Sequence, residues 1–207
     1  MRAPSNPYPT AAPERSSGRA RPLPPSERRA ALVAATLPLV VEHGTKVTTR
    51  QIAEAAGVAE GTIFRVFPDK EALVQAAVQA GLDPMPTVAQ LNAVDTTLPL
   101  EERLVQITAI LQNRLVAVFN LLIAIGWHSP PDELEKHRRS PANEIILRAV
   151  IRLLEPDRDR FRCPISEVVR VLRLLTFAGS HPKITDGRPL TVEQIVSVLL
   201  DGVRQRP

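Results

Sequence analysis

Apolar residues recur at intervals of three and four from residue 26 almost to the end of the chain. No stretch shows the sustained alternation of apolar and polar residues that a half-buried strand requires. A helix brings every third or fourth residue to one face, whereas a strand brings every second residue. The pattern therefore predicts an all-α fold with about nine helices. The 207 residues, 44% of them hydrophobic, suffice for a small helical domain joined to a larger one.

The start of the chain has a different composition. Residues 1–25 hold seven of the 20 prolines and four arginines against one glutamate. Such a segment cannot bury enough apolar surface to fold, so we expect a flexible basic arm. The net charge of +4 lies mostly there, because residues 26–83 carry six Lys or Arg against seven Asp or Glu. The helical pattern then predicts a small domain over residues 26–82 and a larger one over 83–207.

Cysteine content and hydropathy indicate the compartment. Cys163 is the single cysteine, which excludes an intramolecular disulfide and a cysteine-based zinc cluster and favours a reducing compartment. The arm lacks the apolar core of a secretory signal. The most apolar run, residues 115–127, contains Asn120 and is shorter than the roughly 20 residues that span a bilayer. It predicts a buried helix, and we expect a cytoplasmic protein without a membrane partner.

Most of the expected helices have recognisable ends. Ser26 can cap a helix over residues 27–43, in which Pro38 predicts a kink. Asp69 can open a helix for which Gly81 is a natural stop. Residues 82–99 give no clear pattern. The other helices are expected at 100–126, 131–138, 140–154 (a Ser140-Pro141 start), 164–178 and 191–204, the last opened by a Thr191/Gln194 capping box.

Residues 47–70, VTTRQIAEAAGVAEGTIFRVFPDK, contain two short helical segments around a glycine. Thr48 and Gln51 stand three residues apart and can form a capping box that opens the first segment. Gly57 suits a left-handed turn after it. Two short helices joined by a tight turn cross steeply, which predicts a helix-turn-helix. The residues expected to face inward are Ile52, Ala53, Val58, Ile63 and Val66.

The flanks of this motif carry a more specific signal. The run TTRQIAEAAGVAEGTIFRVFPDKEAL strongly resembles the DNA-binding signature of the tetracycline-repressor (TetR/AcrR) family. In that family an aromatic-x-x-Phe-Pro-x-Lys segment follows the motif, and here it runs from Phe64 to Lys70. The resemblance covers roughly residues 45–75, while the rest of the chain is similar only in length and helix count. It implies a transcriptional regulator that places the second short helix in the major groove.

The resemblance implies a set of DNA-contacting residues. Arg65 is the best candidate for reading guanine, because an arginine can donate two hydrogen bonds to that base. Thr48 and Thr49, at a helix start, suit a phosphate, as does Lys70 from the next helix. Gly61 lets the backbone approach the duplex closely. The complete set is Thr48, Thr49, Arg50, Ala59, Glu60, Gly61, Thr62, Phe64, Arg65 and Lys70.

The chain departs from the family pattern at three of these positions. Phe64 stands where tyrosine is common and lacks the hydroxyl, although its ring can contact a thymine methyl group. Ala59 and Glu60 replace a common Ser or Thr followed by lysine. Glu60 meets phosphate unfavourably but can accept a hydrogen bond from the amino group of cytosine. The arginine-rich arm either attracts DNA, through the minor groove, or is a tail without a role.

The larger domain is expected to dimerise and to bind an effector. Helices 164–178 and 191–204 are too apolar for a monomer surface, and the resemblance implies that they pair with their twofold copies. A homodimer then recognises an inverted repeat of double-stranded DNA. Repression relieved by a small-molecule effector is the behaviour that the family implies. Pocket candidates on the long helix are Asn113, Phe119, Asn120, Ile123 and Trp127, although the same stripe can simply be core.

Two other classes of protein remain as alternatives. An enzyme would need a catalytic motif, and the chain has no GxSxG, GxxxxGK or HExxH sequence. The four histidines are scattered, so we expect no enzyme, no metal and no cofactor. The second alternative is a helical interaction protein with a degenerate helix-turn-helix. It would select no DNA sequence.

Overall fold

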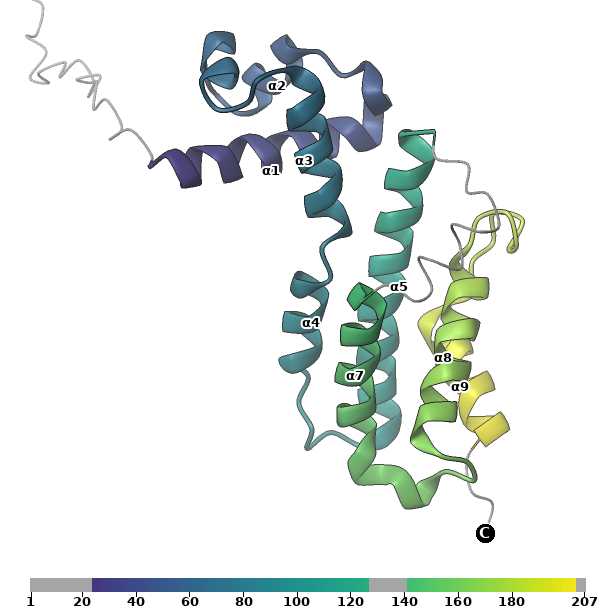
Figure 1. Cartoon of the computed structure of the whole chain (residues 1–207). Coiled ribbons are helices and arrows are strands. Elements are labelled where there is room, and N and C mark those ends of the chain that lie inside the picture. The colour runs from purple at the N-terminus through teal and green to yellow at the C-terminus, as the bar shows by residue number, and fades with distance from the viewer. Residues whose placement is uncertain (1–23, 127–140, 204–207) are drawn as a thin grey trace, which may run out of the picture.

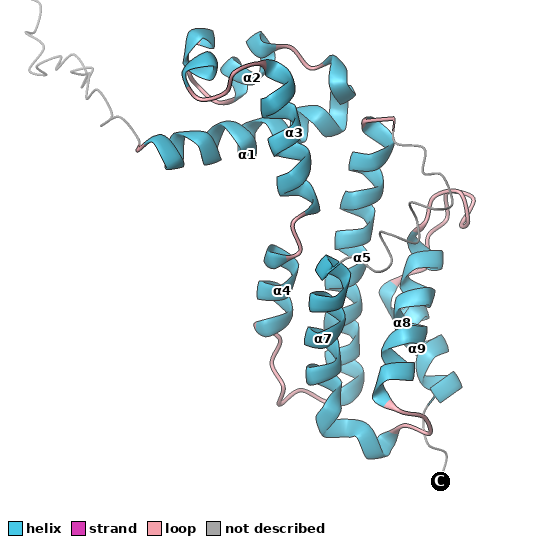
Figure 2. Cartoon of the chain, in the orientation of Figure 1, coloured by secondary structure: helices cyan, strands magenta, loops and turns pink. Residues whose placement is uncertain are grey.

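The computed structural model describes residues 24–126 and 141–203. Within these ranges the chain forms eight α-helices, three short 3-10 helices and no strand, so the predicted all-α class is confirmed (Figures 1 and 2). The amino-terminal elements are α1 (Pro25–His43), η1 (Gly44–Lys46), α2 (Thr49–Ala55), η2 (Glu60–Arg65) and α3 (Lys70–Leu82). They are followed by α4 (Met85–Asn92), α5 (Leu100–Ala124), α7 (Pro141–Leu154), η3 (Glu155–Arg160), α8 (Ile165–Ser180) and α9 (Val192–Val203).

The predicted caps are present at three helix starts. Thr48 and Gln51 form a complete capping box at α2, in which the Gln51 amide accepts from the Thr48 backbone at 2.9 Å. At α9, the backbone N–H of Gln194 donates to the Thr191 hydroxyl at 3.2 Å and the return bond is 2.9 Å long. Asp69 accepts from the backbone of Ala72 at 2.7 Å and opens α3. Each cap satisfies amides that have no intrahelical partner.

Some other expected helix ends were wrong. Ser26 does not cap α1, because the helix already begins at Pro25, whose missing N–H costs nothing in a first turn. The expected end of α1 is confirmed, because the helix runs through Pro38 to His43. Gly81 lies inside α3 and does not stop it. A β-carbon at Gly81 would lie 2.7 Å from a Leu121 methyl carbon, so this glycine allows α3 to pack closely on α5.

Residues 82–99, which gave no clear pattern, contain α4. This helix buries Val88 and Leu91 against the body of the larger half. The arm at residues 1–25, apart from the last two residues, and the helix expected at 131–138 lie outside the described residues. The cap predicted at Ser140 also lies outside the described residues.

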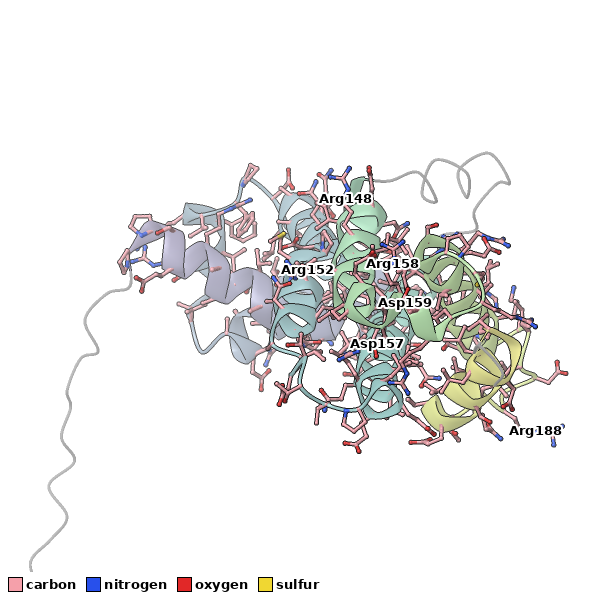
Figure 3. All side chains as sticks on the ribbon, turned by 90° about the horizontal axis from the view of Figure 1, so that it is seen from below. Arg148, Arg152, Asp157, Arg158, Asp159 and Arg188 are labelled. Carbon is pink, nitrogen blue, oxygen red and sulfur yellow. The ribbon has the colours of Figure 1, made fainter. Side chains whose placement is uncertain are left out.

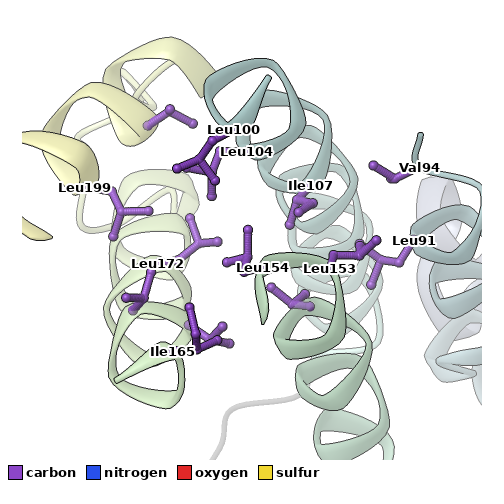
Figure 4. Close-up of a cluster of buried hydrophobic side chains, with 14 of the residues drawn as sticks. Leu91, Val94, Leu100, Leu104, Ile107, Leu153, Leu154, Ile165, Leu172 and Leu199 are labelled. Carbon is purple, nitrogen blue, oxygen red and sulfur yellow. The ribbon is translucent and has the colours of Figure 1, made fainter. Parts of the chain in front are cut away.

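The described residues bury two hydrophobic clusters. One is built by α1, α2, η2 and α3 and includes Leu32, Ile52, Ile63 and Leu73, with Leu121 of α5. The second lies between α4, α5, α7, α8 and α9 and is shown in part in Figure 4. Because α5 contributes its first half to the second cluster and Leu121 to the first, it runs along both halves of the molecule.

A buried ion pair holds the far end of α5. The guanidinium of Arg103, whose side chain is 4% exposed, forms an ion pair with Asp157 of η3 (labelled in Figure 3). It also donates to the carbonyls of Thr96, at 2.7 Å, and Leu98, at 3.3 Å. A charge removed from water needs partners of this kind, although the buried Nε of Arg103 has none among the described residues. Arg103 therefore joins the α4–α5 loop, α5 and η3 at one point.

The second half of α5 is much less buried than expected. By length and composition alone α5 is apolar enough to cross a membrane, with a mean hydropathy of 1.6 over its best window, yet only 17% of that window is buried. Of residues 115–126 only Leu121 is fully buried. The prediction of a wholly buried helix there was wrong, because α1 and α3 cover one side of this segment and leave another open.

Candidate nucleic-acid interface

The helix-turn-helix is built around Gly57. Its φ of +65° is the left-handed conformation that the sequence predicted, and nothing lies within 4 Å of the position of a β-carbon there. Glycine is thus needed for the backbone and not for space. The turn is closed by hydrogen bonds from Gly57 to the Glu54 carbonyl and from Val58 to the Ala53 carbonyl, at 3.1 and 3.0 Å.

Apolar side chains beneath the turn fix the angle between α2 and η2. Ile52, Ala53 and Ile63 are buried as expected, and Val58 and Val66 are partly buried. Phe67 joins them, and the guanidinium carbon of Arg29 on α1 lies 4.2 Å from the centre of its ring. The exposed Arg29 therefore covers one face of the buried Phe67 ring in a cation–π contact.

The second element, η2, is a six-residue 3-10 helix and not an α-helix. Its N-cap is Ala59, which has no side-chain oxygen and makes no cap hydrogen bond. The first turn is closed instead by the Thr62 backbone, which donates to the Ala59 carbonyl at 2.8 Å. Tight 3-10 bonding of this kind satisfies terminal groups where a capping side chain is missing.

The predicted contact residues gather on α2, η2 and the start of α3. Phe64 exposes 53% of its surface, an unusual position for a phenylalanine in a soluble domain. Arg50 and Arg65 are exposed and have no ion-pair partner among the described residues. The fully exposed members of the set are Thr48, Arg50, Ala59, Glu60, Gly61, Phe64 and Arg65, and the partly buried ones are Thr49, Thr62 and Lys70.

Four members of this set already have partners, and that of Thr48 is Gln51 in the capping box. The Thr49 hydroxyl, on the first residue of α2, donates to Oε1 of Glu60, on the first residue of η2. Lys70 donates to the Thr45 carbonyl at 3.3 Å and lies 3.6 Å from the carboxylate of Glu71. Sequence reasoning missed the hydrogen bonds of Thr49 and Lys70, since the first spans 11 residues and the second 25.

Two contacts join this motif to α5. Arg114 donates to the carbonyls of Gly81, at 2.7 Å, and Leu82, which end α3. Partial burial of the guanidinium lowers the pKa of Arg114, and the charge of Asp83 opposes that shift. At Gly44 a β-carbon would lie 2.4 Å from the Ala124 carbonyl oxygen. These two contacts add to the packing of Leu121 in fixing the helix-turn-helix on α5.

The effector candidates lie on the open side of α5. Asn113, Asn120 and Ile123 are exposed, with Ile123 at 62%, and Trp127 lies outside the described residues. Phe119 packs edge-on against Phe177 of α8, at 5.3 Å between ring centres, and against His181, at 4.9 Å. An open depression lies elsewhere, between η3 and the start of α8, and is lined by both charged and apolar residues. None of the four candidates among the described residues lines that depression.

A helix-turn-helix carried on a helical body of this kind defines a class of transcriptional regulators. The model of the tetR family of bacterial regulatory proteins matches residues 32–77. Residues 32–77 thus match the family model, and the chain as a whole shares its fold with solved TetR regulators.

Solved structures of transcriptional regulators share the fold over most of the chain. A TetR transcription regulator from Haloarcula marismortui ATCC 43049 is 17% identical, with a TM-score of 0.59 over 87% of this chain and all of that one. A TetR regulator from Streptomyces coelicolor is 22% identical, with a TM-score of 0.55 over 86% and 99%. A transcriptional regulator from Rhodococcus sp. Rha1 is 17% identical, also at 0.55 over 86% and 99%. No curated protein matches the sequence.

Proposed function

We propose that this protein is a sequence-specific DNA-binding regulator, a homodimeric repressor that a small-molecule effector releases from an inverted-repeat operator. It is proposed as a regulator and not an enzyme, acting in the cytoplasm. The observation that carries the proposal is the exposed set on α2 and η2, held on a TetR-family domain by a complete capping box and the Gly57 turn.

The roles proposed within this set follow from the chemistry of each side chain. Arg65 and Arg50 are exposed cations, able to donate to guanine or to phosphate. Phe64 offers its ring to a thymine methyl group, which would explain why it is half exposed. Thr48, Thr62 and Lys70 contact phosphates and set the orientation on the duplex. Ala59 and Gly61 allow close approach of the backbone.

Support for a homodimer comes from α8 and α9. One face of each helix is buried in the larger half, and the other leaves apolar residues exposed, with Leu174 at 48%, Phe177 at 36% and Val198 at 55%. A second copy that covers these residues would make a four-helix interface. A twofold dimer presents its two η2 helices about 34–36 Å apart or at a multiple of that spacing. Because the two copies are related by a twofold axis, the operator is expected to be an inverted repeat.

The effector is proposed to bind on the open side of α5, where Asn113, Phe119, Asn120 and Ile123 lie and where Trp127 follows. The poor burial of this segment supports the proposal, because an apolar helix face that the protomer leaves open needs a partner. Release from DNA then requires that the effector bind more tightly to a second conformation of the dimer. In that conformation the spacing of the two η2 helices does not match the operator.

The test is selection of bound sequences from random duplex DNA by the purified full-length protein. An enriched inverted repeat, lost or relaxed in Arg65→Ala at the same salt concentration, is the expected result. No enrichment at low salt would overturn the proposal. It would favour the alternative of a helical interaction protein, with which the carboxylate at Glu60 and the engaged Lys70 are compatible.

A further inference from the structure

The only carboxylate on η2 lies on the surface proposed to bind DNA, where DNA phosphates would repel it. Glu60 is exposed, and its Oε1 accepts a hydrogen bond from the Thr49 hydroxyl of α2. Oε2 has no hydrogen-bond partner among the described residues. The hydrogen bond from Thr49 holds the carboxylate between α2 and η2. Without this partner the side chain would turn toward solvent.

Few groups on DNA can face such a carboxylate favourably. Phosphates repel it, and most base-edge atoms in the major groove are acceptors. The donors there are the amino groups of cytosine and adenine. Adenine also presents its N7 acceptor beside the amino group, which repels a second carboxylate oxygen, whereas cytosine presents the amino group as the only polar group of its edge. A fixed carboxylate therefore discriminates in favour of cytosine.

We propose that Glu60 selects cytosine at one position in each half of the operator and that Thr49 is its positioning residue. This inference rests on the proposed function. Thr49 acts through Glu60 because its hydroxyl proton is already donated to the carboxylate. The base preference at that position is then a joint property of the first residue of α2 and the first residue of η2.

The test is the same selection from random duplex DNA, run at one salt concentration with five full-length proteins. They are the wild type, Glu60→Gln, Thr49→Val, the double variant and Glu54→Gln. Glutamine and valine keep the shapes of the side chains they replace. Glu54 is an exposed residue of α2 outside the contact set, so Glu54→Gln removes the same charge without touching the Thr49 contact. Circular dichroism and melting confirm that each variant is folded.

The wild type is expected to enrich cytosine at one position per half-site. In Glu60→Gln that preference falls about fivefold, the equivalent of one hydrogen bond to a base edge, and adenine rises because glutamine pairs with adenine. Thr49→Val weakens the same position and no other, and the double variant loses no more than Glu60→Gln. In Glu54→Gln every position keeps the preference of the wild type.

The two proposals fail in different ways. If Glu60→Gln yields the same preference as the wild type at every position of an enriched repeat, the cytosine assignment is wrong and the regulator stands. A Thr49→Val profile identical to that of the wild type removes the positioning role. If the wild type enriches no sequence, the proposed function itself is overturned and this inference falls with it.

Discussion

At Gly44 the backbone has a φ of +62° and a ψ of −146°, a region that is essentially restricted to glycine. The backbone conformation costs another residue about 1–3 kcal/mol, and the Ala124 carbonyl oxygen lies 2.4 Å from the position that a β-carbon would take. We expect Gly44→Ala to lower the free energy of unfolding by more than the backbone term alone. Urea unfolding at fixed protein concentration measures it.

Gly57→Ala is the matched control for that prediction. Gly57 has nearly the same φ, +65°, but no atom lies within 4 Å of its β-carbon position. Its substitution should cost about 1–2 kcal/mol, the left-handed penalty only. The part of the Gly44→Ala loss that exceeds the backbone range of about 1–3 kcal/mol reports the contact with α5. Equal losses would show that the Ala124 carbonyl moves aside without cost.

The buried guanidinium of Arg103 gives a second prediction at this scale. Arg103→Met removes the ion pair with Asp157 and two hydrogen bonds to backbone carbonyls, and leaves the mostly buried carboxylate with only the exposed Arg160 as a cation partner, at 3.2 Å. We expect a loss of about 3 kcal/mol, measured by urea unfolding. Arg148→Met is the comparison, because the side chains of its pair with Glu144 are 74% and 61% exposed. That loss should stay within about 0.5 kcal/mol, and a similar loss in both variants would contradict the role of Arg103.

Sequence reasoning at the residue scale succeeded where the physical cause is local. The Thr48/Gln51 and Thr191/Gln194 boxes and the left-handed Gly57 all follow from residues within three positions of one another. The structural roles of Gly44 and Arg103 could not be predicted. Their partners lie 80 and 54 positions away, and no spacing rule joins them.

At the scale of elements, Arg114 connects α5 to the end of α3. Arg114→Met removes two charge-assisted hydrogen bonds to the Gly81 and Leu82 carbonyls, each worth about 1.5–3 kcal/mol. We expect faster amide exchange in the last turn of α3, measured by hydrogen–deuterium exchange mass spectrometry. The capping box of α2 should keep its wild-type exchange rate.

Arg114→Lys separates charge from geometry in this prediction. A lysine supplies one point charge and cannot present the planar fork that reaches two carbonyls. It should restore only part of the protection in α3. Full restoration would mean that the two hydrogen bonds matter less than the positive charge beside Asp83.

The periodicity of apolar residues predicted most elements but not all. α5, α7, α8 and α9 lie close to their expected ranges because each buries one long face. α4 was missed because it has only eight residues and two prolines at its start. Pro84 precedes the helix and Pro86 is its second residue. The 3-10 form of η2 was also missed. An alanine N-cap without a capping side chain does not predict whether α or 3-10 hydrogen bonds follow.

At the scale of the whole molecule, the exposed apolar faces of α8 and α9 predict the assembly. Val198→Glu places a charge at the centre of the proposed interface, where it would have no partner. We expect a shift from dimer to monomer in sedimentation velocity and a loss of affinity for the inverted repeat. Met85→Glu on α4, equally exposed at 54%, should leave both unchanged. A Val198→Glu protein that stays dimeric would contradict this interface.

The capping boxes of α2 and α9 both have glutamine at the third residue after the cap, a position where glutamate is the usual alternative. A glutamate there would gain a proton in mild acid and lose part of its acceptor strength. The amide of Gln51 or Gln194 has no such proton to gain. The hydrogen bonds that begin the proposed DNA-facing helix and the proposed interface helix therefore keep the same donors and acceptors when the surroundings acidify, so neither helix start acts as a pH sensor.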